Sequence, residues 1–406
     1  MKTAIVLSGH TMALGVVRAL GSMGVPVIIV HYDEKDTGQY SKYIQASFKA
    51  PHPEKNEAEF INVLLQCANE YSDGVIFPVS DETVVAVARN KDTLSKYFKI
   101  ACPELDIVNK YIDKKYTYAL ADSNGVAAPK TITPQSIKDV EDYAKQVDFP
   151  CLVKPCQSHL FYDYFKCKMF PVNNAVDMLS IYKQARDAGL EVMLQEIIPG
   201  DDDTVVNYNA YFWDGEPLVE FTAEHVRNAP PWWGSPRVAL SNKIPEVIEP
   251  GRKILKAMGF YGYACTEFKK DTRDGLYKLM EVNGRHNLST LLSVRCGINF
   301  PWIQYKHLVS NELPTAKSFK SGIYWIDITR DVGYSLKFLK EEGYSLKQYL
   351  RPYLNQHVYA IFDLSDIKPF VRRCLFLFKQ GLYACFAYLK PVKKNSTRAV
   401  VDENAR

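Results

Sequence analysis

The stretch TEFKKDTRDGLYKLMEVNGR, residues 266–285, contains the pattern that decides the fold. Apolar and aromatic residues recur on both sides of a polar centre, and this predicts two strands, 264–269 and 277–283. The centre predicts a three-residue loop, 273–275, with Gly275 in the left-handed conformation. The stretch therefore predicts an antiparallel hairpin whose register is set by its turn.

This register would bring two acidic side chains together. Glu267 would lie opposite Glu281, and Asn283 would share their face because it is two residues beyond Glu281 on the same strand. Adjacent carboxylates repel each other unless a cation lies between them, and hard oxygen ligands favour Mg²⁺ or Mn²⁺ over zinc. The alternative is a solvated hairpin face, and a register slip of one residue would separate the two acids.

The N-terminal segment is predicted to be a parallel, doubly wound unit. A strand over Thr3–Leu7 is followed by a small-residue turn, a helix over 16–23 and a strand over 25–30. Another strand, 74–79, runs directly into polar residues. Because loops at the carboxyl ends of such strands bind ligands, the candidate substrate-binding residues in this part are His10, Asp81 and Glu82.

Two later segments could bind a nucleotide. Lys154 ends a strand over 151–154, from which its ammonium group could reach a phosphate. Segment 194–203 combines an apolar strand, whose free edge could hydrogen-bond a purine, with acids that could accept from ribose hydroxyls. The alternatives are an exposed strand-end lysine and a plain turn with solvated acids.

Taken in order, these pieces resemble the ATP-grasp superfamily over about residues 1–312. The matching motifs are Asp113-Lys114, Gly125 with Pro129, Val153-Lys154-Pro155, Gln195–Gly200, Glu267-Phe268 and Glu281–Arg285. Within that superfamily the chain resembles the carboxylate-amine ligases related to carbamoyl-phosphate synthetase and D-aspartate ligase.

The resemblance implies that ATP and Mg²⁺ (or Mn²⁺) are the cofactors, and it gives each motif residue a role. Lys114 and Lys154 would hold the ATP phosphates, and Arg285 would bind the phosphoryl group during transfer. The remaining nucleotide-binding residues would be Gln195, Glu196, Ile198 and, at the ribose, Asp202. The magnesium ligands would be Glu267, Glu281 and Asn283.

Two further segments bear on how the phosphates and the acyl-phosphate would be held. Many members of the superfamily cover the triphosphate with a Gly-rich hairpin, whereas residues 156–168 contain no glycine. The resemblance therefore does not assign the residues that would clamp the phosphate. Residues 224–237 resemble the loop that lies over the acyl-phosphate, so Arg227 is a candidate catalytic residue and His225 a candidate substrate-binding residue. The alternative for this second segment is a surface loop with its two tryptophans packed on a neighbour.

The predicted fold class is α/β, an ATP-grasp fold in three parts. Residues 1–110 would form the N-terminal doubly wound domain, and residues 111–312 the ATP-grasp domain with an antiparallel active-site sheet. An α+β lid would span about residues 130–198. Residues 313–406 would form a helical, aromatic and basic extension.

Composition excludes several classes of protein. The net charge of +4 on 406 residues is too small for a nucleic-acid-binding track, and the nine cysteines show no metal-ligand spacing. The N-terminal apolar run is too short for a signal peptide, so a cytoplasmic protein is expected. Residues 367–406 hold nine Lys and Arg against two acids, which indicates either peripheral membrane contact or a helix packed on the core.

The sequence thus predicts an ATP-dependent ligase that joins a small carboxylate, such as an amino acid, to an amine through an acyl-phosphate and releases ADP and phosphate. Its partners would be these small-molecule substrates, and a homodimer is left open. The alternatives are an inactive nucleotide-binding scaffold and an NAD-dependent dehydrogenase. The second is disfavoured because Ser8–Gly15 lacks the GxGxxG spacing.

Overall fold

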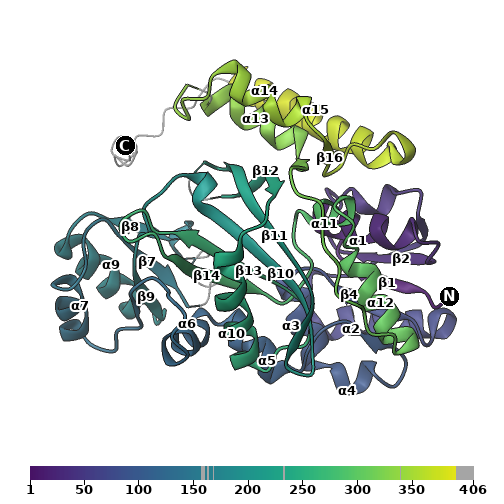
Figure 1. Ribbon diagram of the computed structural model, residues 1–406, viewed down its shortest axis with the longest axis horizontal. Coiled ribbons are helices and arrows are strands. Elements are labelled where there is room, and N and C mark those ends of the chain that lie inside the picture. Colours follow the sequence, from purple (N-terminus) through teal and green to yellow (C-terminus); the bar gives the residue numbers. More distant parts are fainter. Residues whose placement is uncertain (157–160, 162–163, 168, 232–233, 339, 390–406) are drawn as a thin grey trace.

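The computed structural model describes residues 1–156, 161, 164–167, 169–231, 234–338 and 340–389. Within these residues the strands form three separate sheets, which Figure 1 shows as an N-terminal layer, a lateral unit and a large central sheet. The α/β class predicted from the sequence is confirmed.

The N-terminal sheet is parallel throughout, as predicted, with the order β3-β2-β1-β4-β5. Its strands are β1 (Ala4–Leu7), β2 (Val27–His31), β3 (Ile44–Lys49), β4 (Val75–Pro78) and β5 (Lys99–Ile100). The residues of β1 and β4 are buried on both faces, because helices cover both sides of the sheet. These first helices are α1 (Thr11–Gly21), η1 (Gly38–Tyr40), α2 (Glu57–Tyr71), α3 (Asp81–Arg89) and α4 (Lys91–Leu94).

Helix α1 begins earlier than the pattern predicted. The small residues after Ser8 continue into the helix from Thr11 instead of forming a turn, because Ala13 and Leu14 are buried in the core. Gly15 faces the start of a later helix, and a Cβ there would make an ordinary van der Waals contact with the Thr290 side chain, at 3.4 Å. The loop that carries His10 is therefore short and lies directly at the carboxyl end of β1.

Two helices lead into the lateral unit, α5 (Leu105–Ile112) and α6 (Lys114–Ser123). Asp113 caps α6 by accepting a hydrogen bond from the Lys115 amide, and Gly125 follows the helix with a φ of +64°. The first residue of α6 is Lys114, so its side chain is fixed at a helix start.

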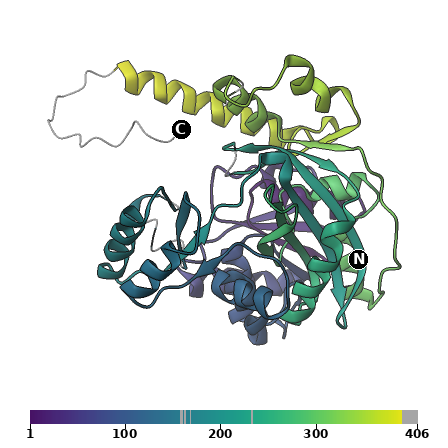
Figure 2. The ribbon, with the colours of Figure 1, turned by 60° about the vertical axis from the view of Figure 1, so that its left-hand side comes forward.

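The lateral unit covers most of the predicted lid. Its antiparallel sheet has the order β6-β9-β7-β8 and its own apolar core. The elements are β6 (Thr131–Ile132), α7 (Ile137–Ala144), β7 (Cys151–Pro155), β8 (Phe170–Val172), α9 (Ala175–Asp187) and β9 (Val192–Glu196). Figure 2 shows this unit standing to one side of the central sheet. Most of the glycine-free segment 156–168 lies outside the described residues.

The central sheet has the order β14-β13-β10-β11-β12-β15-β16. Its strands are β10 (Val205–Trp213), β11 (Glu216–Ala229), β12 (Ser235–Ser241), β13 (Gly262–Lys270), β14 (Tyr277–Asn283), β15 (Tyr324–Ile326) and β16 (His357–Tyr359). Its neighbours pair antiparallel except β15 with β16. The connecting helices are η2 (Asp202–Thr204), η3 (Pro245–Val247), α10 (Ile248–Met258), α11 (Thr290–Arg295) and α12 (Phe300–Ser310).

The β13–β14 hairpin reaches the predicted pairing by a different route. Glu267 pairs with Glu281, as expected, but Phe268 pairs with Leu279, so Met280 is an extra residue in a β-bulge. The bulge lets Leu279 face the core while Glu281 faces the opposite side. The predicted loop is also too short, because the strands end at Lys270 and Tyr277.

The C-terminal segment contains the predicted helices, namely α13 (Ile328–Phe338), α14 (Leu346–Leu354), η4 (Leu364–Asp366) and α15 (Lys368–Leu389). It also contributes β15 and β16 to the central sheet, which the sequence analysis did not predict. In the described part of the chain, no helix is long and apolar enough to cross a membrane. Because Trp325 and Ile326 are fully buried, this segment is part of the central sheet's core and not only an appendage.

Candidate active site

The two acidic residues of the hairpin lie side by side with a lysine. The Glu281 carboxylate accepts hydrogen bonds from Lys114 Nζ at 3.3 Å and from Asn283 Nδ2 at 2.9 Å. Glu267 lies on the paired strand and its Oε2 is 3.8 Å from Nε2 of His225. The structure therefore brings together Lys114, Glu267, Glu281, Asn283 and His225.

The two carboxylates respond to this environment in opposite directions. Burial and the charge of Glu281 raise the pKa of Glu267 above its usual range. Burial acts on Glu281 in the same sense, but Lys114, Asn283 and Arg285 outweigh it and hold the Glu281 pKa below its usual range. Glu281 also outweighs the effect of burial on Lys114, whose pKa is raised. Glu267 is thus the carboxylate that lacks sufficient positive charge around it.

Lys154 projects from β7 toward the same centre. Its Nζ donates to Gln195 Oε1 at 2.8 Å, and Gln195 Nε2 in turn donates to Thr131 Oγ1 at 2.8 Å. Burial and the nearby Lys114 lower the Lys154 pKa to about 7. Two lysines from different parts of the chain therefore face the pair of acids, and their mutual repulsion would be relieved by an anion.

Asn207 is a site residue that the sequence analysis missed. It lies on β10 directly opposite Glu267, and its Nδ2 is 3.2 Å from Nε2 of His225. Its Oδ1 is buried and has no hydrogen-bond partner among the described residues. The signal in the sequence was the polar pair Asn207 and Asn209 at every second position of an otherwise apolar strand.

These oxygen atoms fit a magnesium ion. Glu267 carries a carboxylate short of positive charge, Asn207 has an orphaned carbonyl oxygen, and Glu281 is held ionised nearby. No group of three or more His, Cys, Asp and Glu in the described residues has the geometry of a metal site. Magnesium does not need such a group, since one or two carboxylates and substrate phosphates usually hold it.

A second polar cluster lies at the N-terminal sheet and is connected to the first by Arg285. This guanidinium donates to both carboxylate oxygens of Asp81, at 2.6 and 3.2 Å. Glu82 accepts from the Tyr32 hydroxyl at 2.6 Å, and this bond and others outweigh burial to lower the Glu82 pKa. The predicted residues Asp81, Glu82 and Arg285 thus come from distant segments to one place.

His10 lies in the same cluster. Both of its ring nitrogens are buried and have no hydrogen-bond partner among the described residues. Burial lowers the His10 pKa to about 4, against the opposing effect of Glu82. The imidazole is therefore neutral near pH 7 and offers one donor and one acceptor to a ligand.

The residues expected at the nucleotide base and ribose already have partners within the protein. Glu196 accepts from the Lys130 amide and from Arg273 Nη2, both at 2.8 Å. Ile198 is buried, and Asp202 accepts from the amide and the side chain of Asn228, at 2.7 and 3.1 Å. Through Arg273, Glu196 joins the end of β9 to the β13–β14 hairpin, and Asp202 is held against β11.

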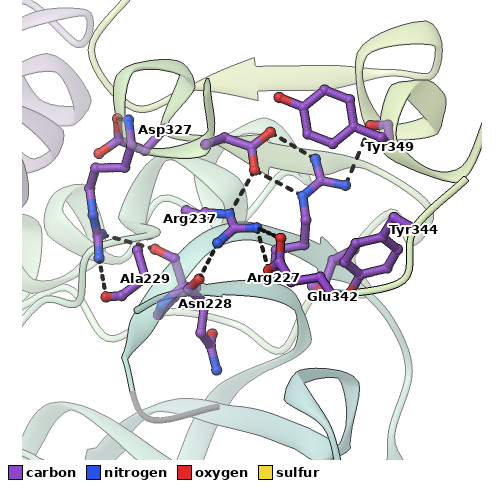
Figure 3. A network of polar contacts seen from close by, with 12 residues as sticks. Arg227, Asn228, Ala229, Arg237, Asp327, Glu342, Tyr344 and Tyr349 are labelled. Atoms are coloured by element: carbon purple, nitrogen blue, oxygen red, sulfur yellow. Dashed lines mark hydrogen bonds and ion pairs between the residues drawn. The ribbon is translucent and has the colours of Figure 1, made fainter. Parts of the chain in front are cut away.

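Arg227 is not on a loop, contrary to the expectation for residues 224–237. Strand β11 continues to Ala229 and β12 starts at Ser235, so Arg227 lies within the sheet. It is fully buried, and both oxygens of Asp331 accept from it at 2.8 Å. Figure 3 shows this network, in which Arg237 also donates to the same aspartate. A catalytic role for Arg227 would require this ion pair to break. The predicted contacts of the two tryptophans lie outside the described residues.

Comparison with known proteins finds relatives in sequence and structure. No family model matches the chain. It is 26% identical to a D-aspartate ligase from Enterococcus faecium over 66% of this chain and 67% of that protein. It is 22% identical to a mitochondrial carbamoyl phosphate synthase large chain from Neurospora crassa, over 74% of this chain but only 26% of that protein.

Solved structures share the fold. One is the biotin carboxylase domain of a Hydrogenobacter thermophilus 2-oxoglutarate carboxylase, described as a dimer in complex with MgADP and bicarbonate. The TM-score is 0.61 at 15% sequence identity, covering 80% of this chain and 73% of that one.

The parallel N-terminal sheet, the lateral unit and the antiparallel sheet with its paired glutamates form an ATP-grasp fold, which the solved structures share. In sequence, the chain is similar to ligases that form carbon-nitrogen bonds, among them the D-aspartate ligase.

Proposed function

We propose that this enzyme activates the carboxylate of an amino acid or related small molecule as an acyl-phosphate and transfers the acyl group to an amine. The observation that carries the proposal is the convergence of Lys114, Lys154 and Arg285 on the pair formed by Glu267 and Glu281. Such a set of charges suits a polyphosphate and its metal.

Each charged residue of the site has its own role. Lys154 and Lys114 bind the ATP phosphates as point charges, and Arg285 stabilises the phosphoryl group as it moves. Glu267, Glu281 and Asn283 would hold Mg²⁺, with Asn207 beside them, and the ion would neutralise phosphate charge when bound. Mn²⁺ has the same ligand preference and is expected to substitute for it.

The proposed reaction proceeds in two steps. An oxygen of the carboxylate attacks the γ-phosphorus and ADP leaves. The amine nitrogen then attacks the acyl carbon, inorganic phosphate leaves and the nitrogen loses a proton. The His10, Asp81 and Glu82 cluster supports binding of the amino-acid substrates, since its carboxylates suit an ammonium group and its imidazole is neutral. The relative named D-aspartate ligase favours an amino acid as one substrate.

We also propose that residues 130–198 act as a lid. They have their own apolar core and bring Lys154 to the site from a separate sheet. An acyl-phosphate must be protected from water, and a unit that closes over it provides this protection.

The experiment measures ADP release from the full chain with ATP and Mg²⁺ across a panel of D- and L-amino acids and amines, with mass spectrometry of the products. Glu281→Gln keeps the size of the side chain but removes a metal-binding charge, so product formation should fall on the order of a hundredfold or more. Glu216→Gln, at an exposed position of the same sheet, is the matched control.

Two results would refute the proposal. One is the absence of any ATP-dependent product across the panel, which would favour a nucleotide-binding scaffold. The other is a Glu281→Gln enzyme as active as Glu216→Gln at saturating Mg²⁺, which would remove the metal assignment.

A further inference from the structure

The C-terminal helix α15 starts from a fixed base. Just before it, the buried Asp366 carboxylate accepts from Arg18 Nε at 2.9 Å and from Ser41 Oγ and the Lys42 amide, both at 2.7 Å. Arg18 also donates to the carbonyl of Ile361 at 2.8 Å. Because a buried charge with several partners holds its geometry strongly, the direction of the following helix is set by the body of the enzyme.

Among the residues whose side chains the structure describes, the first turns of α15 contact the rest of the protein. Phe370 packs edge-to-face against Phe362 at 5.0 Å between ring centroids, and the Arg372 guanidinium lies 4.4 Å from the centroid of the Tyr40 ring. Beyond these contacts the helix extends away from the central sheet (Figure 2). It therefore presents a long free face.

This free face is apolar. Val371, Leu375 and Phe378 have exposed fractions of 46%, 50% and 67% and are spaced four and three residues apart, which puts them on one side of the helix. Ile367 lies one turn earlier on the same side and is 37% exposed. A contiguous row of large exposed apolar side chains is unusual for a free protein surface and marks a contact site.

Cations accompany this apolar row. Lys368, Arg372 and Lys379 fall together along one border of it at helical spacing, and the sequence of α15 contains no Asp or Glu. The chain continues with further basic residues, namely Lys390, Lys393, Lys394 and Arg398. The charge therefore suits an anionic partner and the apolar row suits hydrocarbon.

We propose that α15 attaches the enzyme to the surface of a membrane that contains anionic lipids, with the row from Ile367 to Phe378 inserted at the boundary between headgroups and acyl chains. Such a surface matches both features, whereas a nucleic acid would leave the apolar row exposed to water. A second copy of the chain is a poorer match, because it would bring the basic borders of two helices together and their charges would repel.

The test is co-sedimentation of the full-length enzyme with vesicles of phosphatidylcholine alone or with 30% phosphatidylglycerol. Binding should require phosphatidylglycerol and weaken as salt rises. The variant Leu375→Asp/Phe378→Asp should bind on the order of tenfold or more weakly. Val176→Asp changes an apolar residue on α9 that is exposed to 77%, more than either of these two, and should bind like the unmodified enzyme.

Circular dichroism and ADP release confirm that each variant is folded, so weak binding cannot be ascribed to unfolding. The proposal is overturned if the enzyme binds neither kind of vesicle, or if the double variant binds the vesicles as well as Val176→Asp does. It is also overturned if sedimentation velocity shows a dimer that the double variant disrupts while vesicle binding is absent, because the apolar row would then be an interface between two copies.

Discussion

Lys154 shows how the fold changes the chemistry of one residue. As a free side chain it would be charged at every physiological pH, but burial and the neighbouring Lys114 lower its pKa to about 7. A bound phosphate would favour the charged form and raise this pKa again. Nucleotide binding should therefore be coupled to proton uptake in a defined pH range.

We predict that, when a non-hydrolysable ATP analogue binds, Lys154 contributes an uptake of close to one proton at pH 8 and much less at pH 6. At pH 6 the free enzyme already carries the proton on Lys154, whereas at pH 8 it must acquire it. Calorimetry in buffers of different ionisation enthalpy measures the uptake. The unmodified enzyme should therefore take up close to one proton more than Lys154→Ala at pH 8, and much less than one more at pH 6. Lys115→Ala, which removes a partly exposed lysine paired with Glu191, should behave like the unmodified enzyme.

The β13–β14 hairpin shows how an element adapts to two requirements. Leu279 and Val282 are buried in the core, while Glu281 and Asn283 face the site. Regular alternation would put Leu279 and Glu281 on the same face, so the bulge at Met280 is needed to separate them. Helix α6 supports the bulge, because the Tyr118 hydroxyl donates to the Met280 carbonyl at 2.8 Å.

We expect Tyr118→Phe to lower the free energy of unfolding by about 1–2 kcal/mol, because the Met280 carbonyl loses its donor. Urea denaturation of the two proteins measures this difference. Tyr116→Phe removes a hydroxyl from an exposed tyrosine of the same helix and should have little effect. Equal midpoints for the two variants would show that the bulge does not depend on Tyr118.

At the scale of the whole molecule, buried ion pairs hold the C-terminal segment in place. Asp331 of α13 is fully buried and accepts from Arg227, Arg237 and the Tyr353 hydroxyl. Arg237 also donates to Glu342 and to the carbonyl of Asn228 (Figure 3). The amide of Asn228 in turn donates to the Asp202 carboxylate. The predicted extension is thus bonded directly to the active-site sheet.

Asp331→Asn should destabilise the enzyme by about 3 kcal/mol or more, because two buried guanidinium groups would share a partner without charge. The exposed Glu341→Gln is the control for loss of one negative charge in the same region. Thermal and urea unfolding of both variants give the comparison. A midpoint for Asp331→Asn close to that of the control would mean that the network contributes little to stability.

Contacts between distant segments explain why the proposed domain boundaries are not sharp. Helix α12 belongs by sequence to the segment after the hairpin, yet Tyr305 packs in the core of the N-terminal sheet and its hydroxyl donates to the Lys2 carbonyl at 2.6 Å. Strands β15 and β16 likewise join the central sheet from beyond residue 312. Local patterns predict elements well, but such contacts depend on residues hundreds of positions apart.

Sequence patterns alone predicted many of the strands, among them β13 and β14, as well as the pairing of Glu267 with Glu281 and the order of motifs that indicates an ATP-grasp ligase. The strands follow from periodicity, which acts over a few residues, whereas the pairing is reached through a longer loop and a bulge at Met280 that the turn residues did not predict. Only the tertiary structure placed Asn207 beside Glu267, enclosed Arg227 in an ion pair and joined Arg285 to Asp81. The physical reason is that burial and charge at each site are set by side chains from distant segments, and no local pattern records them.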